Sequence, residues 1–233
     1  MPEETANSSQ AQKGKQWVKI AIAAITVCVV LFAFIWELTL DNEADGDTAA
    51  LAHKGRSAVQ DELDTLDWVI AGFLPLNPYS RPGILLDDVN TVVIHYIGNP
   101  NTTAEQNRNY FAGLAVSGET YASSNFIVGL NGEIVQCVPV DEIAYASNTR
   151  NDDTLSIELC HPDETGQFTV DTYNAAVRLT AWLCDRLGID PSDLIRHYDV
   201  IRKECPKYFV ENEDAWETFK SDVANAASGL RES

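Results

Sequence analysis

The sequence predicts an α/β (α+β) domain, with a mixed central β-sheet flanked by helices, preceded by one transmembrane helix. Two observations lead to this prediction. Between residues 85 and 233, short apolar β-branched runs are interspersed with longer stretches of helical periodicity. Near the N-terminus, an uncharged apolar run is long enough to cross a bilayer. The 233 residues therefore divide into an N-terminal tail and one domain of ordinary size.

The apolar run near the N-terminus predicts a membrane anchor. Residues 20–36 contain no charge, glycine or proline, and Trp17 and Trp36 bracket them as interfacial aromatic residues do. Lysines precede the run and acidic residues follow it, which places residues 1–16 in the cytoplasm and the rest of the chain outside. A cleaved signal peptide would need a shorter core and small residues after it. We therefore expect a single-pass anchor in the cell membrane over 17–38.

Residues 39–79 predict an acidic spacer and a stalk helix. The stretch 41–48 is acidic and poor in apolar residues, whereas 49–73 carries apolar residues near helical spacing. That helix is either a free stalk or a helix packed on the domain. Prolines and a glycine then interrupt the pattern, so we place the domain at 80–233.

Four segments predict strands. Thr91–Tyr96 is apolar and β-branched, which is typical of a buried strand, and Thr154–Cys160 shares this character. Asn125–Leu130 and Glu133–Val138 flank an Asn-Gly pair, which is a strong signal for a hairpin.

Helices are predicted at 103–115, 171–187 and 213–227. The middle helix is the best defined, because it has a stripe of leucines at helical spacing. Asp171 can cap its start and Gly188 can end it.

The charge of the chain argues against nucleic acid as a partner. The formal net charge is -19, and residues 1–40 sum to zero, so the acidic excess lies in the rest of the chain. Nucleic-acid binding needs a basic patch or stripe. No feature of the sequence predicts an oligomeric state.

The cysteines do not form the dense framework of a small disulfide scaffold. Cys137 and Cys160 lie on predicted strands that could be neighbours, so a disulfide and buried free thiols both remain open, and Cys184 has no assigned pairing.

Two histidines and one cysteine carry the chemical signal. His95 ends the first predicted strand, His197 lies in an Arg-His-Tyr-Asp run, and Cys205 follows in Lys-Glu-Cys-Pro. Two imidazoles and a thiolate suit a catalytic zinc ion, which takes three protein ligands and leaves a fourth position to water. Spacing alone does not decide, because a single histidine at a strand end is more often structural.

At these motifs the chain resembles the zinc-dependent N-acetylmuramoyl-L-alanine amidases related to phage lysozyme-amidases and to animal peptidoglycan-recognition proteins. The resemblance covers about residues 85–220 and implies a peptidoglycan-recognition-protein-like fold, a Zn²⁺ cofactor, and peptidoglycan as the substrate. The resembling segments are VVIHYIGNP (92–100), YASSNFIVGLNGEIVQCVP (121–139), LSIELCHPDETGQFT (155–169) and IRHYDVIRKECPKYF (195–209).

The resemblance also implies roles for single residues. His95, His197 and Cys205 match the three zinc ligands. Lys203 matches a lysine that stabilises the developing oxyanion, and Glu158 matches a glutamate that acts as general base in one branch of the family. The reaction implied is hydrolysis of the amide bond between N-acetylmuramoyl and L-alanine during cell-wall remodelling.

The sequence departs from the family pattern at two positions. Ser124 stands where the phage enzymes carry a tyrosine that assists catalysis, so the burden shifts to Glu158. Asn125 stands where many bacterial relatives carry a histidine, and we expect altered contacts around the ligands or the substrate. His161 is either a further group near the metal or, as we favour, a polar residue at a strand's exit.

Three other functions remain to be weighed. A non-catalytic module that binds peptidoglycan or muropeptides is the main alternative, although relatives of that kind often lack the cysteine that is present here as Cys205. An interaction protein that reuses the fold has no positive support. A cytoplasmic enzyme that recycles wall fragments conflicts with the predicted anchor over 17–38.

Overall fold

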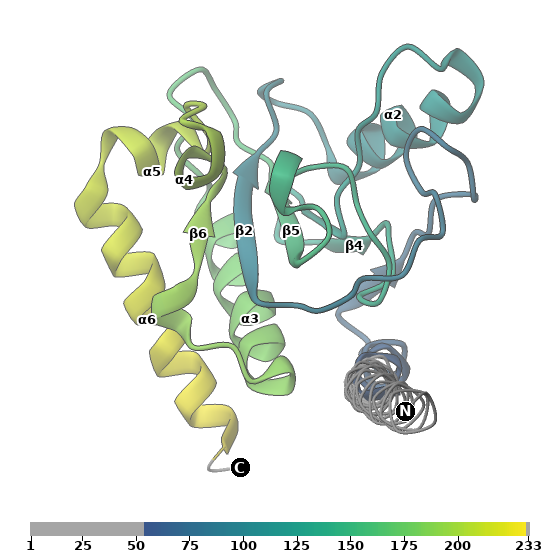
Figure 1. The fold of residues 1–233 in the computed structure, drawn as a ribbon. Helices are drawn as coiled ribbons and strands as arrows, with labels where there is room; N and C mark the ends of the chain where they lie inside the picture. The colour runs from purple at the N-terminus through teal and green to yellow at the C-terminus, as the bar shows by residue number, and fades with distance from the viewer. Residues whose placement is uncertain (1–53, 232–233) are drawn as a thin grey trace, which may run out of the picture. The chain divides into compact units, whose positions relative to one another are not determined.

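The computed structural model describes residues 54–231 (Figure 1), so the anchor predicted over 17–38 and His53 lie outside them. A single mixed sheet of six strands, in the order β1-β4-β3-β5-β2-β6, forms the centre of the fold. Only β3 and β4 pair antiparallel, and the other neighbours run parallel. The predicted α/β class with a mixed sheet is confirmed. None of the helices within 54–231 combines the length and the apolar character that a membrane crossing requires.

The helices flank the sheet, as predicted. The strands are β1 (Val69–Ala71), β2 (Thr91–Tyr96), β3 (Phe126–Val128), β4 (Ile134–Gln136), β5 (Thr154–Leu159) and β6 (Ile195–Arg196). The helices are α2 (Ala104–Ser117), α3 (Val170–Leu187), α4 (His197–Ile201), α5 (Lys207–Glu211) and α6 (Glu213–Arg231), and residues 54–63 are also helical. Two short 3-10 turns are η1 (Asn148–Arg150) and η2 (Pro191–Asp193).

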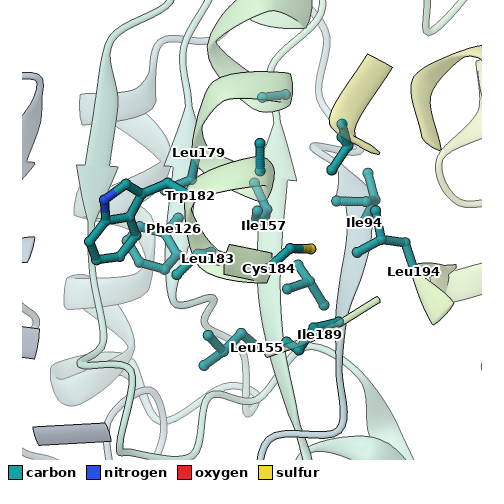
Figure 2. Close-up of a cluster of buried hydrophobic side chains, with 14 of the residues drawn as sticks. Ile94, Phe126, Leu155, Ile157, Leu179, Trp182, Leu183, Cys184, Ile189 and Leu194 are labelled. Carbon is teal, nitrogen blue, oxygen red and sulfur yellow. The ribbon is translucent and has the colours of Figure 1, made fainter. Parts of the chain in front are cut away.

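The sheet separates two apolar clusters. Because strand side chains alternate between faces, Ile94 and Ile157 join the cluster beneath α3 and α6, where Leu179 and Leu183 also lie (Figure 2). Ile127 points to the other cluster, which is covered by α2. Both clusters consist of buried side chains, so the cluster that a strand residue joins shows which face of the sheet it occupies.

The strands β2 and β5 position the candidate site. They run parallel and side by side (Figure 1), in a register that places His95 opposite Glu158. Each of these residues alternates with an apolar neighbour in the cluster beneath α3. His95 and Glu158 therefore project together from the face that α2 partly covers, near the carboxyl ends of their strands.

The start of α3 differs from the prediction. Thr169, not Asp171, is the N-cap, and its hydroxyl oxygen accepts a hydrogen bond from the Thr172 amide at 3.0 Å. The same hydroxyl donates to the Leu130 carbonyl at 2.7 Å, so the cap also ties the helix to the β3–β4 hairpin. Gly188, with φ at 70°, ends the helix as predicted.

The compact unit also begins before residue 80, which corrects the predicted boundary. Val59 and Leu63, from helical residues 54–63, are buried in the cluster beneath α3. Arg56 donates to the Leu86 carbonyl at 2.5 Å, and β1 adds a parallel strand beside β4. The stretch with prolines that marked the predicted domain boundary is an irregular segment within the domain, where Leu74 and Ser80 are buried, and the helix is packed on the domain rather than free.

The four cysteines of the described residues, Cys137, Cys160, Cys184 and Cys205, are free and buried. Of the two alternatives left open for Cys137 and Cys160, buried free thiols is the one observed.

Candidate metal centre and active site

Three potential metal ligands meet at one buried point. The donor atoms of His95, His197 and Cys205 lie within 4.8 Å of one another, and all three residues are buried. The sulfur of Cys205 is 3.9 Å from Nδ1 of His95. A tetrahedral zinc ion with usual bond lengths would hold a nitrogen and a sulfur roughly 3.5 Å apart. The donor set and its spacing therefore fit a zinc ion with three protein ligands.

Neighbouring elements bring these residues together. His95 belongs to β2, and β6 pairs beside it with Arg196 opposite Ile94, so His197 follows directly at the start of α4. Arg196 is 7% exposed, and its guanidinium is held by the carboxylates of Asp199 and Glu213. This buried network fixes the strand-to-helix turn that aims His197 at the cluster.

A backbone contact positions Cys205, and burial controls the pKa of its thiol. The Tyr198 amide donates to the Cys205 carbonyl at 2.8 Å, which closes the loop after α4 back onto its first turn. Burial raises the pKa of the Cys205 thiol to about 12, the Glu158 carboxylate adds to the rise, and Lys203 opposes it. A thiolate at this position therefore depends on a nearby cation.

Both histidines are held in the neutral form that can donate a lone pair. Burial, then the charges of His197 and Lys203, lower the pKa of His95 well below its ordinary value. Burial, then Lys203, lowers the pKa of His197 to about 4. Two neutral imidazoles are suitable ligands for a divalent metal.

The carboxylate of Glu158 lies beside this cluster. Its Oε1 lies 4.0 Å from Nδ1 of His95, and among the described residues its buried Oε2 has no hydrogen-bond partner. Burial raises the pKa of Glu158 to about 8, and Lys203 opposes the rise. A buried carboxylate without a partner is costly unless a cation, a water or a substrate completes its bonding.

The cluster opens into a cavity of about 400 Å³. The exposed Lys203 lies on its wall, so the cavity contains all five residues that the sequence singled out. A second hollow of about 510 Å³ lies along the start of α2 and shares Tyr96, Phe111, Glu158 and Lys203 with the first. The two hollows together provide space on either side of Glu158 and Lys203.

Several residues in or next to this cavity have no signal in the sequence. Ser147 and Asn148 contact the ring nitrogens of the two histidines. Tyr121 and Tyr145 meet edge to face at 5.6 Å on the cavity wall, and Tyr121 is 62% exposed. These residues lie in loops and in the short turn η1, where serine, asparagine and tyrosine are common for many reasons.

The remaining residues of interest lie apart from the metal cluster. His161 contacts the carbonyls of Ile97 and Asp163 through its two ring nitrogens, in keeping with a polar residue at a strand's exit. Asn125 is buried and bonds to Ser156 and to backbone carbonyls. The expectation that Asn125 alters contacts around the ligands or the substrate stays a prediction. Ser124 donates to the Phe126 carbonyl at 2.9 Å, so its hydroxyl is satisfied within the fold.

Comparison with protein families identifies a match over the centre of the chain. The family model described as N-acetylmuramoyl-L-alanine amidase matches residues 86–208, a range that holds every predicted site residue. N-acetylmuramoyl-L-alanine amidase BlyA of Bacillus subtilis (strain 168) is 31% identical over 178 residues, covering 67% of this chain and 47% of BlyA. CwlL of Bacillus licheniformis, another N-acetylmuramoyl-L-alanine amidase, is 30% identical over 167 residues, with coverages of 66% and 46%. The chain spans about half the length of these curated relatives.

Solved structures share the fold. The structure of PlyL aligns with a TM-score of 0.58 and 19% identity, covering 68% of this chain and 98% of that one. The catalytic domain of XlyA aligns with a TM-score of 0.57 and 22% identity, covering 66% and 98%. At these identities the similarity establishes the fold alone.

Proposed function

The chain belongs to the N-acetylmuramoyl-L-alanine amidase family, and from that premise we propose that it hydrolyses the amide bond between N-acetylmuramoyl and L-alanine in peptidoglycan, with Zn²⁺ as cofactor. One observation carries the proposal. The buried ligand group of His95, His197 and Cys205 lies beside the carboxylate of Glu158, whose Oε1 is 4.0 Å from Nδ1 of His95 and whose buried Oε2 has no hydrogen-bond partner among the described residues.

The residues of the cavity supply the parts of an amide hydrolysis. When bound, zinc would polarise the scissile carbonyl and activate a water molecule. Glu158 accepts the proton of that water and passes it to the nitrogen of L-alanine as the C–N bond breaks. The water oxygen ends in the new carboxylate of the lactyl group. Lys203 places a positive charge beside the oxygen that becomes negative in the tetrahedral intermediate.

The shape of the site supports a substrate that extends in two directions. The bond to be cut joins a sugar-borne lactyl group to a peptide, so a productive site needs room on both sides of the reacting carbon. The two hollows meet at Glu158 and Lys203 and provide such room. The first hollow has exposed tyrosine surface in Tyr121, and the second has the amide side chains of Asn99 and Gln106.

A first experiment measures metal content and product with the full chain in detergent. We expect about one zinc per chain and the release of L-alanine amino termini from cell walls. Cys205→Ser should lose both metal and activity, whereas Glu158→Gln should keep the metal and lose activity. A wild-type chain that holds zinc and binds walls without releasing amino termini would indicate the non-catalytic binding module instead.

We also propose that the enzyme works at the outer face of the cell membrane, with residues 17–38 as the anchor and residues 1–16 in the cytoplasm. The support is the uncharged run 20–36 and the charge difference across it. Tethering would confine the enzyme to wall close to the membrane, which suits remodelling. To test this topology, a reporter that works only outside the cytoplasm is fused after residue 233, and we expect it to be active. If only a reporter that works in the cytoplasm is active at that position, the topology is contradicted.

A further inference from the structure

One short turn contacts both ligand histidines at the ring nitrogen Nε2. Nε2 of His95 is 3.2 Å from the hydroxyl oxygen of Ser147. Nε2 of His197 is 2.7 Å from Oδ1 of Asn148. Ser147 and Asn148 are consecutive, so the side chains of two neighbouring residues contact both imidazoles.

The contact with Asn148 specifies the tautomer of His197, and the contact with Ser147 is compatible with the same tautomer at His95. An amide oxygen only accepts hydrogen bonds, so Nε2 of His197 must carry the hydrogen. Since the ring is neutral, its Nδ1 then has a free lone pair. The Ser147 hydroxyl can accept in the same way from Nε2 of His95, whose Nδ1 lies 3.9 Å from the Cys205 sulfur. Each ring then presents Nδ1 as its metal-binding atom.

The backbone conformation of the turn does not by itself require an asparagine at position 148. Asn148 has φ at 54°, in the left-handed region where glycine is the least strained residue. The side chain of Asn151 holds the turn in place, because its Oδ1 accepts from the amides of Ser147 at 2.6 Å and Ala146 at 3.2 Å. Glycine would serve this backbone at least as well, so the Asn148 side chain calls for a separate reason.

We propose that Ser147 and Asn148 are positioning residues that fix both ligand histidines as the Nε2–H tautomers, with Nδ1 directed to the metal. Hydrogen bonds to the non-coordinating ring nitrogen orient a ligand histidine and strengthen its donor atom. Here one turn does so for both imidazoles of the site. The inference rests on the zinc site of the proposed function and adds residues that the ligand motif does not contain.

The first test compares zinc affinity among full-length variants, using a competing chromophoric chelator and no substrate. Asn148→Gly keeps the left-handed backbone and removes the acceptor, and we expect it to weaken zinc binding by about 10- to 100-fold. Asn148→Asp retains an acceptor oxygen and tolerates the same backbone, so its affinity should stay within a few-fold of wild type. Ser147→Ala removes the hydroxyl that contacts Nε2 of His95, and its control Ser147→Thr keeps a hydroxyl at that position.

The second test reads the tautomers directly in the metal-free chain, from the nitrogen NMR shifts of the imidazole rings. Wild type should show the Nε2–H form at His95 and His197. Asn148→Gly should show a mixture at His197 and leave His95 unchanged, a pattern that a general loss of structure would not produce.

The outcomes separate this inference from the proposed function. If Asn148→Gly binds zinc as tightly as wild type, Asn148 serves only the backbone of the turn and the inference fails, whatever the activity on cell walls. If zinc affinity follows the acceptors but wild type releases no amino termini, the proposed hydrolysis fails and the positioning role stands.

Discussion

At the scale of single residues, the proposed hydrolysis depends most directly on the carboxylate of Glu158. Glu158→Gln keeps the shape of the side chain and removes the proton acceptor. We expect kcat to fall by about 10²- to 10⁴-fold, with unchanged zinc content because the three ligands remain. Amine release and metal analysis on the same sample provide the measurement. A variant that loses its zinc would assign Glu158 to holding the metal rather than to proton transfer.

Lys203 is the second residue whose role can be measured. It lies on the wall of both hollows, and its charge acts on His95, His197 and Glu158. Lys203→Ala should lower kcat by about 10²- to 10³-fold, as the loss of an oxyanion donor does, with little change in KM. Lys220→Ala is the matched control, because this lysine pairs with Glu217 on α6 and lies outside both hollows. A change in KM alone would show that Lys203 binds substrate and does not stabilise the transition state.

At the scale of elements, the first turn of α3 tests which residue caps the helix. Thr169→Ala removes the acceptor for the Thr172 amide and the bond to Leu130, and should lower the free energy of unfolding by about 1 kcal/mol. Thr169→Ser should be nearly neutral because it keeps the hydroxyl. Asp171→Ala removes only a charge in the first turn, so we expect a smaller loss. Urea unfolding of the three variants measures these free energies, and a larger loss of stability in Asp171→Ala than in Thr169→Ala would contradict the observed cap.

The segment from η1 to β5, which carries Asn148, gives a prediction about pH. Burial alone would raise the pKa of Asp153, but hydrogen bonds from Arg150 and Asn90 outweigh it and lower the pKa below its ordinary value. A lowered pKa in the folded state stabilises the fold above the ordinary pKa of an aspartate, and the contribution disappears as pH falls through the lowered value. Asp153→Asn should therefore reduce stability most at neutral pH. In urea unfolding at several pH values, its difference from wild type should shrink toward acid, and a difference that grows there would contradict this.

The sequence predicted those helices and strands that a local pattern of residues identifies. The β-branched run of β2 and the Asn-Gly pair between β3 and β4 specify their elements without help from the rest of the chain. Strands as short as β1 and β6 hold too few residues for a period to show, and their pairing comes from tertiary packing. The N-cap of α3 was assigned to the wrong residue because aspartate ranks above threonine as an N-cap, so the sequence favoured Asp171 over Thr169.

The same division applies to the site. His95, His197, Cys205, Glu158 and Lys203 were named because motifs shared with a family carry them, and the structure brings all five to one cavity. Ser147 and Asn148 have no such motif, because their contacts join η1 to β2 and α4 across about 50 residues of chain. Contacts of that kind can be recognised only after the sheet order is known.

At the scale of the whole molecule, the beginning of the domain carries a measurable prediction. Residues 54–79 contribute β1, which covers the edge of β4, and place Val59 and Leu63 in the core. Full burial of each such apolar side chain contributes about 1.5–3 kcal/mol. A chain that begins at residue 80 should therefore unfold at a markedly lower temperature than one that begins at residue 54, or fail to fold. Calorimetry of the two chains measures this, and equal unfolding temperatures would show that the segment is a detachable stalk whose packing adds no stability.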